Sequence, residues 1–312
     1  MKPTQAAKEP TIPLILTPRH EQILQAVYEY RYMTAQDITH LLFSKGSLAY
    51  VRRHMSALAG GNDQQMRHYL YRFPFPTGTA GNRERIFTLG ALGRDFLANV
   101  LGMPADWYFR PYKSDHLSHS HILHHVLLTR FVVAATAHTR NHATLRLLQS
   151  RLCHELARNQ AGVARAKNPT SATPVIIPDA MLLFAHQATG ARYPVLLEID
   201  RGTTFQSKFQ AQIQARLEFI RSGAYKKVFD HPAVTVAYVT TGASPTHVHT
   251  RAKTMAAWTH RILTELELQN WGVIFRFTAV SLDTLFADIP TLLEEPVWYR
   301  PDTAEVVPLF GT

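Results

Sequence analysis

Two consecutive apolar segments near the middle of the chain constrain its fold more than any other feature. VIIPDAMLLF and YPVLLEID are dense in residues that favour strands, and HQATGAR between them is rich in turn-forming residues. Two strands joined by a short turn pair as a hairpin. Because strands this apolar must be covered on their faces, the hairpin predicts a sheet inside an α/β domain.

The hairpin carries three carboxylates among its apolar residues. Side chains alternate along a strand, so Glu198 and Asp200 share one face of the second strand, and pairing brings Asp179 alongside them. Three carboxylates this close repel one another unless they are protonated, paired or bridged by a cation. Mg²⁺ or Mn²⁺ would remove that repulsion, so we interpret the acids as ligands of such an ion. The alternative is a solvated strand end with ordinary surface acids.

The segments around the hairpin predict the rest of an α/β domain over residues 119–282. Their apolar periodicity alternates between that of helices and that of strands. Residues 283–312 show no clear pattern, so we interpret them as a C-terminal tail. The expected elements are a long helix from His119, a strand or helix in ATLRLLQSRLCHELARN, a helix from Thr204 to Ser222 capped by Gly223, a strand VTVAYVTT, a helix from about Val248 to Leu268, and a strand GVIFRFTAV.

Residues 14–106 have the element order of a winged helix-turn-helix domain. Three helical segments are followed by two strand-like segments, RHYLYRF and RERIFTL, with a loop rich in Pro and Gly between them. In this fold the third helix enters the DNA major groove and the hairpin contacts phosphate. The expected helices are Pro18–Tyr30, TAQDITHLLF and Ser47–Ala59, with TLGALGRDFL closing the domain and residues 107–118 forming a junction.

The net charge is concentrated in the same part of the chain. Residues 1–170 carry 21 Lys and Arg against 10 Asp and Glu, a net +11, whereas residues 171–312 carry 12 against 13, a net −1. A basic surface on one domain favours a polyanion, because phosphate neutralisation releases counterions. Double-stranded DNA is the expected partner, although winged helices also serve as protein-interaction modules. The expected DNA contacts lie on the third helix and the hairpin: Ser47, Tyr50, Arg52, Arg53, Ser56, Arg67, Arg72, Arg83 and Arg85.

Composition argues against several other classes of protein. Cys153 is the only cysteine, which prevents an intramolecular disulfide or a thiolate metal cage and suits a reducing cytoplasm. The polar start MKPTQAAKEP predicts no signal peptide, and the apolar region VLLTRFVVAATA is interrupted by Arg130 and too short to span a bilayer. The sequence contains no phosphate-binding loop motif and no nucleophile elbow, so it indicates neither nucleotide-driven chemistry nor a serine hydrolase.

The acidic motifs resemble those of a known nuclease core. PDA at residues 178–180 and ExD at residues 198–200 look like the PD-(D/E)XK pattern of restriction-endonuclease-like domains. More narrowly, LEIDRGTT after PDAMLLF, behind a winged helix and a histidine-bearing helix, resembles the bacterial replication-relaxation family. That family is similar to plasmid mobilisation relaxases built on a restriction-endonuclease fold. The resemblance covers roughly residues 14 to 280.

The resemblance implies a metal-dependent site. Asp179 and Glu198 would be the metal ligands with Asp200 beside them, and Glu155 would be the extra acid contributed upstream. A metal-bound water would attack a phosphodiester while Mg²⁺ or Mn²⁺ stabilises the developing charge. The implied protein is a DNA endonuclease or nickase, similar to a relaxase, that serves plasmid or mobile-element replication or mobilisation.

One departure from the nuclease pattern opens a different interpretation. The pattern has a Lys two residues after the second acid, and this chain has Asp200 there. Related families move the Lys to the following helix, where Gln212 stands and Lys208 lies one turn earlier. If Lys208 does not reach the site, the protein is a degenerate DNA-binding adaptor or regulator whose nuclease fold recruits other replication, transfer or transposition proteins or a second copy of the chain. A metal-dependent hydrolase of small molecules would leave the basic first half unexplained.

A histidine-rich segment offers a rival metal site. HLSHSHILHH places His121 and His125 on one helical face, at the spacing of a two-histidine site. A third ligand would be needed, and the sequence has no HExxH motif. Capping, hydrogen bonding or phosphate contact are the alternative roles for this cluster, which consists of His116, His119, His121, His124 and His125.

Overall fold

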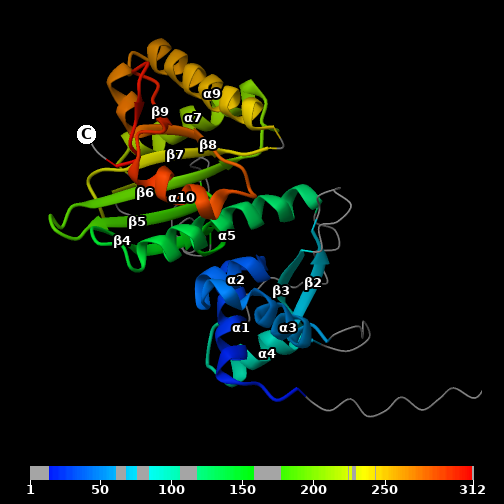
Figure 1. Cartoon of the computed structure of the whole chain (residues 1–312). Coiled ribbons are helices and arrows are strands. Elements are labelled where there is room, and N and C mark those ends of the chain that lie inside the picture. The colour runs from blue at the N-terminus through cyan, green and yellow to red at the C-terminus, as the bar shows by residue number, and fades with distance from the viewer. Residues whose placement is uncertain are drawn as a thin grey trace, which may run out of the picture. The chain divides into compact units, whose positions relative to one another are not determined.

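The computed structural model divides the chain into two compact units, residues 1–118 and residues 119–312. Each unit is described here by itself. The described residues are 14–60, 68–75, 84–105, 118–157, 177–223, 225–226, 230–242 and 244–310. Figure 1 shows the ribbon of the whole chain.

Helices form most of the first unit. Thr17 and Thr34 each make a capping box with the residue three positions later, and these caps start the first two helices. Val51, Met55 and Leu58 recur at helical spacing and are buried, which explains the third helix. The three predicted helices and the closing helix are confirmed as α1 (Pro18–Tyr30), α2 (Ala35–Leu42), α3 (Leu48–Leu58, after the 3-10 turn Lys45–Ser47) and α4 (Ala91–Asn99).

The predicted hairpin of this unit forms part of a three-stranded sheet. Its strands β2 (Leu70–Pro74) and β3 (Arg85–Leu89) pair antiparallel, and the short β1 (Met33–Thr34) pairs with the other edge of β3. Sequence analysis missed β1, because two residues carry no readable alternation. Helix α4 packs closely on the start of the hairpin: a Cβ added at Gly93 would lie 2.2 Å from the carbonyl oxygen of Tyr69.

A seven-stranded sheet forms the centre of the second unit. The order is β10-β9-β8-β7-β6-β5-β4. Strands β4, β5 and β6 pair antiparallel, β6, β7 and β8 pair parallel, and β8, β9 and β10 pair antiparallel. The strands are β4 (Leu145–Leu152), β5 (Ala180–His186), β6 (Arg192–Asp200), β7 (Thr235–Thr240), β8 (Phe275–Ala279), β9 (Trp298–Tyr299) and β10 (Val306–Val307).

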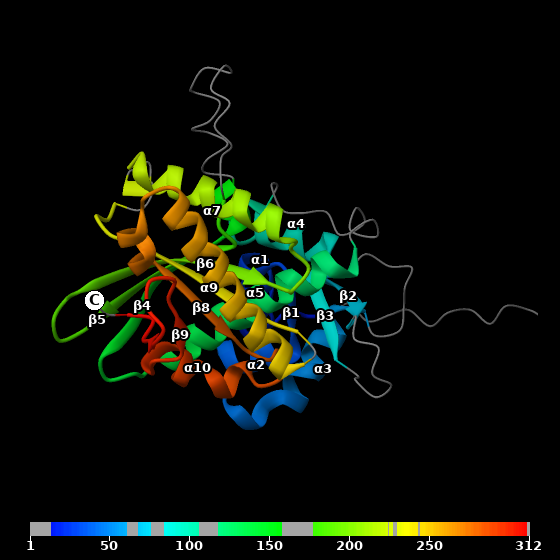
Figure 2. The ribbon, with the colours of Figure 1, turned by 90° about the horizontal axis from the view of Figure 1, so that it is seen from above.

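Helices cover both faces of this sheet. Figures 1 and 2 show α7 (Gln206–Arg221) and α9 (Pro245–Glu265) over one face, and α5 (His119–Thr139) with α10 (Leu285–Glu294) over the other. The apolar stripes of α7 and α9 join strand residues such as Leu196 in one buried cluster. Helix α5 is buried on nearly all sides along its centre, where it lies between the sheet and α10.

The end of the chain belongs to this unit and corrects the prediction of a tail from residue 283. Helix α10 packs on α5, and β9 and β10 extend the sheet beyond β8. Trp298 is fully buried, and its indole N–H donates to the carbonyl of Leu292 at 2.7 Å. The two strands are too short to show alternation, and Pro290 interrupts the helical pattern of α10. Within the described residues, no helix is long and apolar enough to cross a membrane.

Candidate functional site

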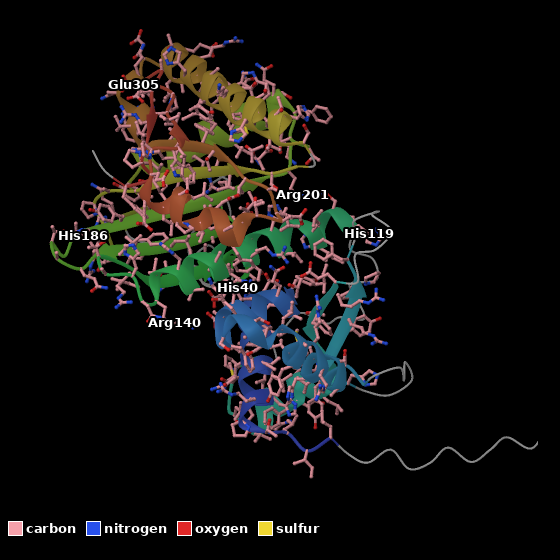
Figure 3. All side chains as sticks on the ribbon, in the orientation of Figure 1. His40, His119, Arg140, His186, Arg201 and Glu305 are labelled. Atoms are coloured by element: carbon pink, nitrogen blue, oxygen red, sulfur yellow. The ribbon has the colours of Figure 1, made fainter. Side chains whose placement is uncertain are left out.

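The acidic residues of the predicted site meet at one end of the central sheet. Glu198 and Asp200 lie at alternate positions of β6, opposite Tyr238 and Thr240 of β7. Asp179 comes directly before β5, whose first residue pairs with Leu197 of β6. In Figure 3, Arg201 marks this end of β6, and His186 marks the opposite end at the β5–β6 turn. The hairpin and the shared face of Glu198 and Asp200 are therefore as predicted from strand alternation.

Glu198, whose side chain is 16% exposed, packs against a buried cation that sequence analysis did not identify. Its carboxylate pairs with the guanidinium of Arg216, which is 4% exposed and also donates to the carbonyl of Ile177 at 3.2 Å. Burial raises the pKa of Glu198 to about 8, which outweighs the opposing effect of Arg216, and the charge of Asp179 adds to the rise. Burial, and then the charge of Glu198, raise the pKa of the neighbouring Tyr238.

Asp179 is held from two sides. Its Oδ1 lies 3.0 Å from Nε2 of His124 on α5, and its Oδ2 accepts the backbone N–H of Ile199 at 2.8 Å. The carbonyl of Asp179 also accepts the N–H of Cys153, at 2.8 Å. The Asp179 carboxylate therefore ties α5 to β6, and His124 is the member of the predicted histidine cluster that contacts the acidic site.

Asp200 is paired with a third basic residue. The Nε of Arg251, on α9, donates to Oδ2 at 3.0 Å, and its second nitrogen donates to the carbonyl of Thr204 at 2.6 Å. The guanidinium lies 5.0 Å from the ring centroid of Trp258. The N–H of Gly202 adds a hydrogen bond to Oδ2 at 3.2 Å. The loop after β6 is therefore fastened to α9.

These contacts give each carboxyl group a partner within the protein and reduce the repulsion between the acids. Each acid has its own basic partner, from α5, α7 or α9. Among the described residues, the carboxylates do not form a group of three ligands with all ligand atoms within 4.8 Å. An ion bound by Asp179 and Glu198 would have to displace His124 and Arg216, so this arrangement does not fit a preformed Mg²⁺ or Mn²⁺ site.

The other residues predicted for the catalytic site lie on α7 and in the helical turn after β4. Lys208 and Gln212 are exposed on α7. The Glu155 carboxylate accepts the N–H of Leu152 at 3.3 Å, as a residue at the start of a helical turn does. Arg216 was the informative residue on α7, because it occupies the apolar stripe that also contains Phe209 and Leu217. A basic residue at such a position signals a buried partner.

A different group of residues has the spacing of a metal site. Nε2 of His138 lies 2.6 Å from one oxygen of Glu294, and Nε2 of His142 lies 3.2 Å from the other. However, Nδ1 of His142 accepts the N–H groups of Thr144 and Leu145. The neutral ring therefore carries its proton on Nε2, which donates to Glu294 and has no lone pair for a metal. The group clamps the end of α5 to α10.

The predicted DNA contacts of the first unit are mostly exposed. Tyr50, Arg52, Arg53 and Ser56 are exposed on α3, and Arg85 is exposed on β3. Ser47, before α3, and Arg72, on β2, are half-buried, while Arg67 and Arg83 lie outside the described residues.

Comparison with known proteins identifies the family. The family model described as replication-relaxation matches residues 24–234. This range holds about two thirds of the chain, from α1 through the acid-bearing hairpin and α7. The comparisons with curated proteins and with solved structures found no match. The family match agrees with the resemblance seen in PDAMLLF and LEIDRGTT, and the chain belongs to the replication-relaxation family.

Proposed function

We propose that this protein binds double-stranded DNA through α3 and the β2–β3 hairpin and acts in the replication of a plasmid or other mobile element. The observation that carries the proposal is the exposed basic face of α3 and β3. Arg52, Arg53 and Arg85 make no hydrogen bond or ion pair among the described residues, so their charges are available to phosphate. The family match supports the role in replication.

The order of elements in the first unit supports a winged-helix mode of binding. Helices α1, α2 and α3 precede the two strands of a hairpin, and α3 has a buried apolar side and an exposed basic side. In winged helices the third helix reads the major groove while the hairpin contacts the backbone. Arg52 and Arg53 would contact DNA from the helix, and Arg85 from the hairpin.

We assign the acidic end of the second unit a structural role. We further propose that this unit serves as a platform for other replication, transfer or transposition proteins. The helix–strand–strand–strand–helix–strand order, with one acid just before β5 and two on β6, supports the likeness to a PD-(D/E)XK domain. Their partners argue against cutting. A metal that took Glu198 from Arg216 would leave the buried guanidinium without its carboxyl partner, which opposes the fold.

A metal-dependent nickase is the second candidate. It is favoured by the approach of Asp179 to Glu198 on neighbouring strands, which is close enough for the Asp179 charge to raise the pKa of Glu198. Two carboxylates are enough to hold one Mg²⁺ together with water and phosphate oxygens. In this candidate, DNA binding would release both acids from their basic partners.

DNA binding is tested by fluorescence anisotropy with a labelled duplex over a range of salt concentrations. The logarithm of affinity should fall with the logarithm of salt by about 0.9 per phosphate contact. Arg53→Ala should weaken binding and lower this slope by about one unit. Arg221→Ala, at the end of α7 in the second unit, serves as the matched control and should leave both unchanged. Equal effects of the two substitutions would contradict the assignment of the DNA-binding surface to α3.

Cleavage is tested with supercoiled plasmid in the presence of Mg²⁺ or Mn²⁺. The structural role predicts no nicked product from the wild type. Glu218, an exposed acid on α7, provides the control. If nicking is lost in Glu198→Ala and kept in Glu218→Ala, the structural role is wrong and the protein is a nickase. Binding in the anisotropy assay without nicking under either metal would exclude the nickase on this substrate.

A further inference from the structure

The first unit contains a small cavity on its basic face. It lies between the first turn of α2, the exposed side of α3 and the strand β3, and its volume is about 130 Å³. This is far more than the roughly 15 Å³ that admits a single water, so the cavity can hold a group of several atoms. The side chains that line it are those of Ala35, Gln36, Arg52, Ser56, Glu84, Arg85 and Phe87.

Two arginines from different elements flank this cavity. Arg52 and Ser56 are one helical turn apart on α3, and Arg85 and Phe87 are alternate residues of β3, so each pair lines the cavity from its own wall. Neither arginine makes a hydrogen bond or ion pair within the described part of the chain. Two exposed guanidiniums with no ion-pair partner among the described residues therefore lie beside one surface cavity, where a single anion can contact both.

The lining favours phosphate. A guanidinium presents a planar fork of N–H donors that matches phosphate oxygens, and the Ser56 hydroxyl and the Gln36 amide add donors. The buried ring of Phe87 is apolar and supplies no competing acceptor. Glu84 is the acidic side chain of the lining, against two arginines. The lining therefore has more basic than acidic groups, which favours an anion.

The geometry points to a subsite that seats one backbone phosphate of DNA between Arg52 and Arg85. This inference rests on the proposed DNA-binding function and adds a specific anchor to it. Because one phosphate would be bound jointly by the helix and by the hairpin strand, it would fix the position of α3 relative to the duplex. Such a contact strengthens binding to every sequence alike.

A double-mutant cycle tests whether the two arginines share one phosphate. Duplex affinity is measured by anisotropy over a salt range for Arg52→Ala, Arg85→Ala and the double variant. Each single substitution should lower the salt slope by about 0.9, and the double variant should lower it by about the same amount, because only one phosphate is lost. Arg53→Ala, exposed on the same helix but outside the cavity lining, should lower the slope additively when combined with Arg52→Ala.

Further variants and a second ligand separate the alternatives. Arg52→Lys keeps the charge and loses the fork, so it should keep the slope and weaken affinity. A slope loss of about 1.8 in the Arg52 and Arg85 double variant would show two independent phosphate contacts and overturn the shared subsite. Unchanged binding in both single variants would overturn it and leave the DNA-binding proposal standing. If the wild type binds no duplex, both proposals fail. Tight, Arg52-dependent binding of inorganic phosphate at constant ionic strength, without competition from duplex, would assign the cavity to a free phosphate ligand instead.

Discussion

Replacing Glu198 with glutamine should change how the stability of the second unit depends on pH. Glutamine imitates the protonated carboxyl group in shape and charge. In the wild type, burial raises the pKa of Glu198 to about 8 although Arg216 lies against it. The folded state therefore binds this proton more strongly than the unfolded state, in which the pKa takes its ordinary value of 4.5. Stability from this group is fully present below pH 4.5 and is lost as the pH rises through 8.

The size of the effect follows from the difference between the two pKa values. Each unit corresponds to 1.36 kcal/mol, so a rise from 4.5 to about 8 corresponds to about 5 kcal/mol in total. Between pH 5 and pH 9 the wild type should lose about 4 kcal/mol that the glutamine variant keeps. Titrating groups far from Glu198 are common to both proteins, so their contributions cancel in the difference.

Urea denaturation at pH 5, 7 and 9 measures this difference. Three of the four tryptophans, Trp258, Trp271 and Trp298, lie in the second unit, so tryptophan fluorescence reports mainly on its unfolding. Urea is preferred to guanidinium because it does not screen the ion pair. The variant should match the wild type near pH 5 and become more stable than it at pH 9. The prediction fails if the difference in the free energy of unfolding stays constant with pH, or if the wild type becomes the more stable protein as the pH rises. Either result would show that Arg216 outweighs burial.

Three further predictions concern single contacts. Burial, and then the charge of His54, lower the pKa of His20, so the stability that α1 owes to it is present above pH 6.5 and lost as the pH falls. The hydrogen-exchange protection factors of α1 amides should therefore fall at pH 5.5 in the wild type and not in His20→Gln. Arg251→Leu leaves the buried Asp200 without its cation and should lower the free energy of unfolding in urea by about 3–5 kcal/mol. Adding Asp200→Asn should recover much of this loss. If it does not, the loss comes from packing on Trp258. Gly93→Ala places a Cβ against the backbone of Tyr69 and should lower the stability of the first unit by about 1–3 kcal/mol, although alanine has the better helix propensity. An unchanged thermal melt of the first unit would contradict the close packing of α4 on the hairpin.

Some features of the acidic site can be predicted from the local sequence pattern, and others cannot. Strand alternation was enough to place Glu198 and Asp200 on one face, because it depends only on backbone geometry. The basic residue of α7 that serves the acidic site was expected at Lys208, as a replacement for the missing Lys of the nuclease pattern, with Gln212 one turn later. Helical spacing alone does not say which face of α7 meets the sheet, and the basic residue on the inward face is Arg216.

The sequence by itself determined the local elements of this protein. The capping boxes at Thr17 and Thr34, the apolar periodicity of the helices and the alternation in the two hairpins are readable because each arises from neighbours in the chain. Family membership was also readable, because it lies in short motifs around Asp179 and Glu198.

Only the tertiary structure decided how the acids are neutralised. Asp179, Glu198 and Asp200 are paired with residues 55, 18 and 51 positions away, on three helices that pack on two faces of one sheet. It also decided that residues after 282 complete the sheet, through strands too short to leave a pattern. The physical reason is the same in both cases: a long-range contact depends on which faces pack together, and this is settled by burial of the whole core.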